Sequence, residues 1–155
     1  YPIEAVRTMA RIIEATEARP ELFAPHPFAP GAAEEDQVTE AISFTACELA
    51  AQIGARAIAC LTFSGKTARM IAKYRPWVPI LAFSDNPYVA ALLHLVRGTV
   101  GIHMPFQSHT DAVIERVRQE LLRRGWARPG DRVVVTAGMP LPVKGKTNMV
   151  QVLTL

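Results

Sequence analysis

The chain is poor in cysteine and has no long hydrophobic run. Only Cys47 and Cys60 are present among 155 residues, far apart and without the spacing of a metal site or a redox motif. We expect them to be buried free thiols in a reducing compartment. The longest apolar run, residues 88–96, is interrupted by His94 and is too short to cross a membrane, and no signal peptide is visible. The prediction is a cytoplasmic protein with no membrane partner.

The sequence also has little excess of positive over negative charge. The sequence has 17 lysines and arginines against 14 acidic residues, which gives a formal net charge of +3. The densest basic group lies on one helical pattern without interleaved aromatic residues, and its members are Arg116, Arg118, Arg123 and Arg124. Such a group is typical of a solvated helix face rather than a nucleic-acid patch. We therefore expect no nucleic-acid partner.

Residues that could support catalysis are few. The four histidines show none of the spacings that mark nucleophile or metal sites; they are His26, His94, His103 and His109. Of these, His103 and His109 stay candidates for contacting an anion. The acidic run at 34–36 is explained by the start of a helix, where negative charge is favoured. We expect no catalytic residue and no bound metal in this chain, so a binding or regulatory module fits better than an enzyme.

The patterns that are present predict one domain rich in both helices and strands. Half of the residues are apolar and a fifth are charged, which suits a globular domain with a core. Apolar residues at helical spacing predict helices at about 2–18, 36–53, 68–74, 87–96 and 111–124. Short apolar runs predict strands at 57–61, 78–83, 99–103, 132–137 and 148–154. For the helix at 36–53 we expect a buried face made of Val38, Ile42, Thr45, Cys47, Leu49 and Ile53.

The order of these segments predicts the fold class. Strands that alternate with helices imply a parallel sheet covered on both faces. The last connection is too short for a right-handed crossover, so the last strand should be antiparallel and at an edge. The sequence therefore predicts an α/β fold, a three-layer α/β/α domain with a five-stranded, mostly parallel sheet. The proline-rich segment 19–33 is the best candidate for a linker.

A small polar turn connects the first predicted strand to a helix, and it consists of Thr62, Phe63, Ser64, Gly65, Lys66 and Thr67. The first amides of a helix have no partners and the helix dipole favours negative charge, so such a turn can hold an anion. The hydroxyl groups add donors, the glycine permits close approach and the lysine adds charge. We interpret the turn as a phosphate-binding turn, although the Walker spacing is absent. A capped helix start without a ligand is the alternative.

A second loop, residues 138–146, comes after the fourth predicted strand and is rich in proline and glycine. Ligands of parallel sheets collect at the carboxyl ends of the strands, where both loops should lie. We therefore expect the two loops to border one crevice.

Three segments carry a family resemblance and occur in the family's order. Residues 1–9 (YPIEAVRTM) are similar to a Y-P-x-E-A-V-x-x-M helix. Residues 62–67 (TFSGKT), with YRP at 74–76 and a proline-led strand at 79–80, are similar to a T-x-S-G-x-[ST] segment, a helix, Y-R-P and a proline-led strand. Residues 130–138 (GDRVVVTAG) and 145–148 (GKTN) are similar to a G-D-x-V-V-V-x-x-G…G-x-T-N close. Together they resemble the C-terminal part of pyruvate kinase.

The resemblance implies a division of the chain. Residues 1–18 look like the last helix of the family's catalytic (β/α)₈ barrel, 19–33 like a linker and 34–155 like the separate C-terminal domain. The whole enzyme transfers a phosphoryl group from phosphoenolpyruvate to ADP with Mg²⁺ and usually K⁺. Its catalytic lysine, arginines and metal-binding carboxylates belong to the barrel upstream of Tyr1. We expect a piece of a longer protein that binds no cofactor itself and is inactive alone.

The resemblance also implies an allosteric role. In the family this domain binds a phosphorylated sugar or nucleotide effector and forms contacts within a tetramer. The turn from Thr62 to Thr67 matches the loop that holds the effector phosphate. The loop that closes over the sugar is matched by Gly138, Lys144, Gly145 and Lys146. The first basic residue of the last helix is Arg116, a turn later than in members that bind fructose 1,6-bisphosphate, so a sugar monophosphate or AMP fits equally well.

Two other interpretations remain open. The first is a free-standing phosphate-binding module without catalysis. The second is an unrelated small α/β enzyme that acts on a phosphorylated metabolite.

Overall fold

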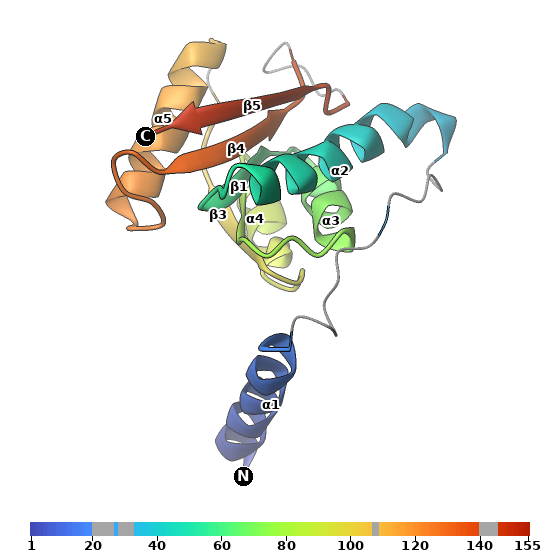
Figure 1. Cartoon of the computed structure of the whole chain (residues 1–155), viewed down its shortest axis with the longest axis vertical. Coiled ribbons are helices and arrows are strands. Elements are labelled where there is room, and N and C mark those ends of the chain that lie inside the picture. Colours follow the sequence, from blue (N-terminus) through green and yellow to red (C-terminus); the bar gives the residue numbers. More distant parts are fainter. Residues whose placement is uncertain (20–26, 28–32, 107–108, 140–145) are drawn as a thin grey trace.

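A five-stranded sheet forms the centre of the computed structural model, which describes residues 1–19, 27, 33–106, 109–139 and 146–155. Its strands lie in the order β3-β2-β1-β4-β5. Figure 1 shows β4 and β5 side by side. Their bounds are Ala57–Leu61 (β1), Ile80–Ser84 (β2), Thr99–His103 (β3), Arg132–Ala137 (β4) and Met149–Thr154 (β5). All five predicted strands are therefore confirmed, and only the second is shifted by more than one residue at its start.

The directions of the strands also agree with the sequence prediction. The three pairs β1–β2, β2–β3 and β1–β4 are parallel, whereas β4 and β5 are antiparallel. The strand β5 lies at the edge because the connection from β4 is too short to cross over the sheet.

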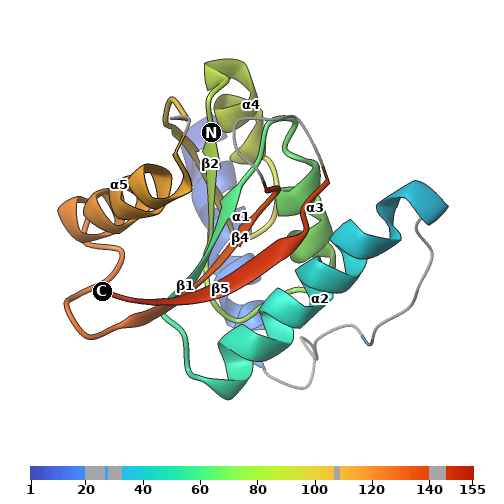
Figure 2. The ribbon, with the colours of Figure 1, turned by 90° about the horizontal axis from the view of Figure 1, so that it is seen from above.

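Helices cover both faces of the sheet. Their bounds are Pro2–Glu17 (α1), Gln37–Gln52 (α2), Lys66–Lys73 (α3), Pro87–Leu93 (α4) and Thr110–Arg123 (α5), with a short 3₁₀ helix, η2, at Glu34–Asp36. Helix α5 packs on one face, and α2 and α3 pack on the other together with Leu93 of α4 (Figure 2). The predicted three-layer α/β/α domain is thus confirmed.

The two faces of the sheet result from the alternation of side chains along each strand. In β1, Ala57, Ala59 and Leu61 belong to the core under α5, whereas Ile58 and Cys60 belong to the core under α2 and α3. Every residue of β1 is buried, as expected for a central parallel strand.

The buried face of α2 differs from the prediction. The buried residues are mostly small, and they are Thr39, Glu40, Ser43, Ala46, Cys47 and Ala50. Of the predicted set only Cys47 is fully buried, and Val38 is 55% exposed. Small side chains let the helix backbone approach the sheet closely, so the face is chosen by fit rather than by hydrophobicity. Leu49 and Ile53 of the predicted set are partly buried against the core, so the hydrophobic pattern alone predicted this face only in part.

An ion pair between α2 and α3 helps to fix these helices. Glu40 is only 3% exposed, and Lys73 Nζ lies 2.5 Å from its Oε1. The hydrogen bond from Lys73 to Glu40 raises the pKa of the lysine. Beside this pair the rings of Phe44 and Tyr74 meet edge to face at 5.2 Å. These contacts hold α2 against the end of α3.

Both cysteines are buried and free, as the sequence predicted. Burial raises the pKa of the Cys47 thiol and that of the Cys60 thiol to about 12. The two thiols are therefore neutral near pH 7 and are poor nucleophiles.

Helix α1 confirms the predicted helix at the start of the chain, but it buries none of its side chains. In Figure 1 it lies apart from the sheet. An ion pair between Arg97 Nη2 and Glu17 Oε1, at 3.0 Å, connects its end to the segment before β3. Among the helices of the described residues, none combines the length and the apolar character needed to cross a membrane.

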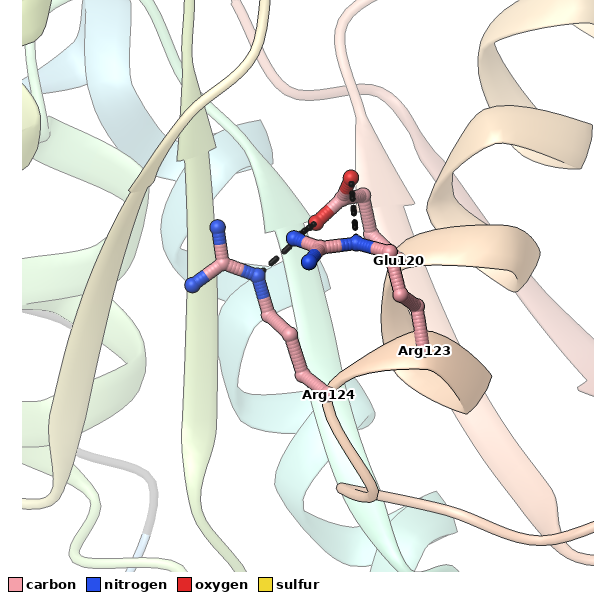
Figure 3. Close-up of polar contacts among 3 residues, drawn as sticks. All are labelled: Glu120, Arg123 and Arg124. Atoms are coloured by element: carbon pink, nitrogen blue, oxygen red, sulfur yellow. Dashed lines mark hydrogen bonds and ion pairs between the residues drawn. The ribbon is translucent and has the colours of Figure 1, made fainter.

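Three of the four arginines of the basic group on α5 pair with acidic residues of the same helix, and they are Arg118, Arg123 and Arg124. Glu120 accepts hydrogen bonds from both Arg123 and Arg124 at 2.8 Å (Figure 3). Arg118 lies 3.5 Å from Glu115 and also donates to the carbonyl oxygen of Thr154 at 2.6 Å. Internal pairing of this kind is typical of a solvated helix face.

This arrangement predicts that the free energy of unfolding decreases slightly at acidic pH. The hydrogen bonds from Arg123 and Arg124 lower the pKa of Glu120 from 4.5 to about 2. Because the folded pKa lies below the unfolded one, the stabilisation is complete above pH 4.5 and disappears as the pH falls towards 2. The cluster is solvated, so we expect Glu120→Gln to cost at most about 1 kcal/mol at pH 7.

Urea unfolding of the wild type and Glu120→Gln at several pH values would measure this difference. Glu115→Gln is the matched control, since Glu115 lies 3.5 Å from a single arginine, Arg118, and its side chain is 56% exposed. A difference between wild type and Glu120→Gln that stays constant down to pH 2 would contradict the expectation.

Candidate functional site

The sheet has a switch point between β1 and β4. From β1 the chain continues through α3 to β2 on one side, and from β3 it returns through α5 to β4 on the other side. In open α/β sheets the crevice outside the carboxyl ends of such neighbouring strands is the usual place for a ligand. The loops that leave β1 and β4 meet at this crevice, and they contain Thr62 and Gly138.

The turn after β1 is shaped by internal contacts. Thr62 is 3% exposed, and its Oγ1 accepts a hydrogen bond from the amide of Gly65 at 3.0 Å. Gly65 has a φ of +79°, and a Cβ at this position would lie 3.0 Å from Leu93 Cδ2. A left-handed backbone with so little space favours glycine strongly. The turn therefore leads directly into α3, which begins at Lys66. The first amides of this helix point outward.

The start of α3 is tied to the segment that precedes β5. Thr67 and Thr147 are both buried, and their Oγ1 atoms lie 2.7 Å apart in a hydrogen bond. The two residues are 80 positions apart in the sequence. This contact brings the end of the second loop against the start of α3, directly after the turn at 62–65.

The two loops border one cavity of about 470 Å³. Its lining includes these predicted site residues: Thr62, Phe63, Ser64, Lys66, Thr67, Gly138 and Lys146. Gly65 is not part of the lining but sets the shape of the turn. Lys144 and Gly145, the other predicted members, lie outside the described residues. The expectation that the two loops border one crevice is thus met by the residues the structure describes.

Phe63 has a different role from its neighbours in the turn. Its ring meets that of Phe106 edge to face, with centroids 5.1 Å apart, and packs against the core under α5. The side chain anchors the turn to the core. Only the backbone of Phe63 is suited to an anion.

Sequence reasoning missed the part of the cavity that comes from the start of α2. Glu35, Asp36 and Thr39 line it, together with Leu61 and Thr147. Lys66 Nζ lies 2.5 Å from Asp36 Oδ2. The acidic run at 34–36 explains a helix start on its own, so nothing local indicated a pairing with a lysine 30 residues away.

A second hollow, of about 510 Å³, lies beside the first and shares Phe63 and Ser64 with it. Its other lining residues come after β2 and begin α4, and they are Asp85, Asn86, Pro87 and Tyr88. Asn86 caps α4, because its Oδ1 accepts from the amide of Tyr88 at 2.9 Å. The turn after β1 thus lies between two hollows at the same edge of the sheet.

Other candidate groups lie outside the cavity. His103 and His109 are both exposed, and neither is in its lining. Within the described ranges, no three or more His, Cys, Asp or Glu residues are grouped closely enough to hold a metal ion.

The fold and the cavity define a class: an α/β domain with a pocket at the switch point of its sheet. The family model described as "Pyruvate kinase, alpha/beta domain" matches residues 40–153, and the chain belongs to this family. This confirms the family that the three sequence segments predicted.

Complete relatives support the same assignment. The chain is 36% identical over 154 residues to the pyruvate kinase of Geobacillus stearothermophilus, a match that covers 98% of this chain and 26% of the relative. It is 39% identical over 153 residues to the pyruvate kinase of Clostridium acetobutylicum, a match that covers 98% of this chain and 32% of that relative. The pyruvate kinase of Mycobacterium tuberculosis H37Rv is 34% identical over 152 residues, and this match covers 98% of this chain and 31% of that relative. The chain thus spans between a quarter and a third of the length of the curated relatives it matches.

Proposed function

We propose that this chain is the effector-binding C-terminal domain of a pyruvate kinase and that its cavity binds the phosphate group of an allosteric ligand. The observation that carries the proposal is the convergence of the turn at 62–67 with Gly138 and Lys146 in one cavity at the switch point of the sheet. The ligand is a phosphorylated sugar or nucleotide.

The phosphate is held by the turn and by the start of α3. The outward amides of Lys66 and Thr67 donate to its oxygens, and the helix dipole favours its charge. The hydroxyl of Ser64 is exposed and adds a donor at the mouth of the cavity. Lys66 and Lys146, from the two loops, supply charge-assisted contacts. Thr62 and Thr67 act differently, since their hydroxyls already hold the turn and the second loop in place.

The parent enzyme transfers a phosphoryl group from phosphoenolpyruvate to ADP in the cytoplasm, as a tetramer. Its catalytic groups and its sites for Mg²⁺ and K⁺ belong to the barrel, to which residues 1–18 contribute a helix. Residues 34–155 are the regulatory domain, and 19–33 are the linker. This chain alone is catalytically inactive and binds neither nucleic acid nor membrane. The pairing of the α5 arginines with acidic neighbours supports the absence of a nucleic-acid site.

Regulation proceeds by a shift of populations. An effector that binds the active form of the tetramer more tightly favours that form by the difference in its binding free energies, typically about 1–3 kcal/mol. Helix α1, which joins the domain to the barrel, is the element through which the shift would reach the catalytic site.

Replacing two residues of the turn tests the phosphate site. Ser64→Ala combined with Lys66→Ala removes a hydroxyl donor and a charge, and we expect the affinity for a bound phosphate ester to fall about tenfold to a hundredfold. Calorimetric titration with fructose 1,6-bisphosphate, glucose 6-phosphate, ribose 5-phosphate and AMP measures the loss and identifies the effector class.

Arg56→Ala is the control, because Arg56 is an exposed cation that precedes β1 and so lies at the opposite end of the strand from the turn. It should leave the affinity unchanged. Equal affinities in the wild type and the double variant would remove the turn from the site.

A further inference from the structure

One of the two lysines of the proposed phosphate site, Lys66, already forms an ion pair within the protein. Lys66 Nζ and Asp36 Oδ2 are 2.5 Å apart, and both residues line the cavity. The side chain of Asp36 is 17% exposed, so its carboxylate is largely withdrawn from water, whereas that of Lys66 is 52% exposed. The lysine that would contact a phosphate therefore has an anionic partner within the protein.

The orientation of Asp36 is not explained by the start of its own helix. Asp36 occupies the N-cap position of α2, where an aspartate side chain ordinarily accepts hydrogen bonds from the next amides. Its side chain makes no such bond and points instead to Lys66 of α3. Glu35 lines the same cavity and adds a second negative charge there.

We propose that Asp36 competes with the ligand for Lys66 and thereby restricts the site to dianionic phosphate groups. The inference rests on the proposed function. A monoanionic ligand would merely exchange one carboxylate-like charge for another at Lys66, with no net gain. A phosphate dianion brings more charge and more acceptor oxygens, which can reach Lys66 and the first amides of α3 together. Asp36 is thus a specificity-determining residue that lowers affinity and raises selectivity.

Amide NMR titrations of the ¹⁵N-labelled chain, with inorganic phosphate and with acetate as probes, test this directly. The reporters are the amides of Gly65 and Lys66. We expect Asp36→Asn to bind phosphate about fivefold more tightly than the wild type. Acetate should give saturable shifts in Asp36→Asn only. Asparagine retains the N-cap preference of aspartate, and Asp36→Ser provides a second variant with the same preference.

Glu34→Gln is the matched control, because it removes the same charge from the same short helix without being part of the cavity lining. It should change the phosphate affinity by less than about twofold. Lys66→Met completes a double-mutant cycle, which isolates the coupling between the two side chains. In the Lys66→Met background, Asp36→Asn should give a clearly smaller gain than in the wild type, because only the repulsion between the carboxylate and the phosphate is then removed.

The outcomes distinguish the competition from the phosphate site on which it rests. A gain of equal size with and without Lys66, or an equal gain in Glu34→Gln, would overturn the competition, because the carboxylate would then act only through general repulsion. Phosphate binding that needs Ser64 and Lys66 but is unchanged in Asp36→Asn would overturn it and leave the phosphate site standing. No binding by either the wild type or Asp36→Asn would overturn both.

Discussion

Replacing Phe83 with alanine is expected to destabilise the domain by about 3–5 kcal/mol, because the side chain lies at the centre of the core under α5. It is 0% exposed and pairs in register with Leu61 of β1 and Ile102 of β3. All three side chains lie in the same core cluster as Val113 and Val117 of α5. Removing the ring leaves a cavity bordered by three strands and a helix, which a close-packed core cannot fill by small movements.

Urea unfolding followed by circular dichroism measures this loss, which is between about a fifth and all of the roughly 5–15 kcal/mol of an ordinary domain. Tyr88→Ala is the control, since it removes another aromatic ring from a side chain that is 80% exposed. We expect Tyr88→Ala to cost less than about 1 kcal/mol. Similar losses in the two variants would show that Phe83 is not the centre of the core.

Gly101→Ala is expected to cost about 3 kcal/mol, through a clash that side-chain movement cannot relieve. A Cβ at this position would lie 1.8 Å from the carbonyl oxygen of Ala90, and the next nearest atoms are also Ala90 backbone atoms. Helix α4 would have to move away from β3, which would disturb the packing of Leu93 in the core under α2 and α3.

Gly54→Ala separates this clash from the general cost of replacing glycine. Gly54 has a φ of +59° and no atom within 4 Å of a Cβ built there, so only backbone strain of about 1 kcal/mol is expected. Amide hydrogen exchange provides the second measurement, because Gly101→Ala should lower protection in α4 and Gly54→Ala should not. If Gly101→Ala is no more costly than Gly54→Ala, the close approach of α4 to β3 would be wrong.

Most of the architecture could be predicted from the sequence because its signals are local. The run from Arg132 to Ala137 is rich in apolar, β-branched residues, which favour a strand whatever segment it pairs with. The short connection before β5 determines that this strand is antiparallel. Each of these signals is complete within a short stretch of the chain.

The site was only partly predictable, since part of it comes from distant segments. The turn at 62–67 was visible, but its partners were not. Asp36 reaches Lys66 across 30 positions, and Thr147 reaches Thr67 across 80. The sequence marks Asp36 as a helix start and Thr147 as one residue of a loop. Neither pattern contains information on which helix end lies over which turn.

The amino-acid sequence by itself determined the family, through three motifs that resemble it. It also determined the five strands and the turn that faces the carboxyl end of β1, because periodicity and turn chemistry operate between near neighbours. The tertiary structure decided which face of α2 is buried, why Gly101 cannot carry a side chain and which carboxylate meets Lys66. These depend on how closely each helix approaches the sheet, and that distance is set by the fit of small side chains from several segments at once.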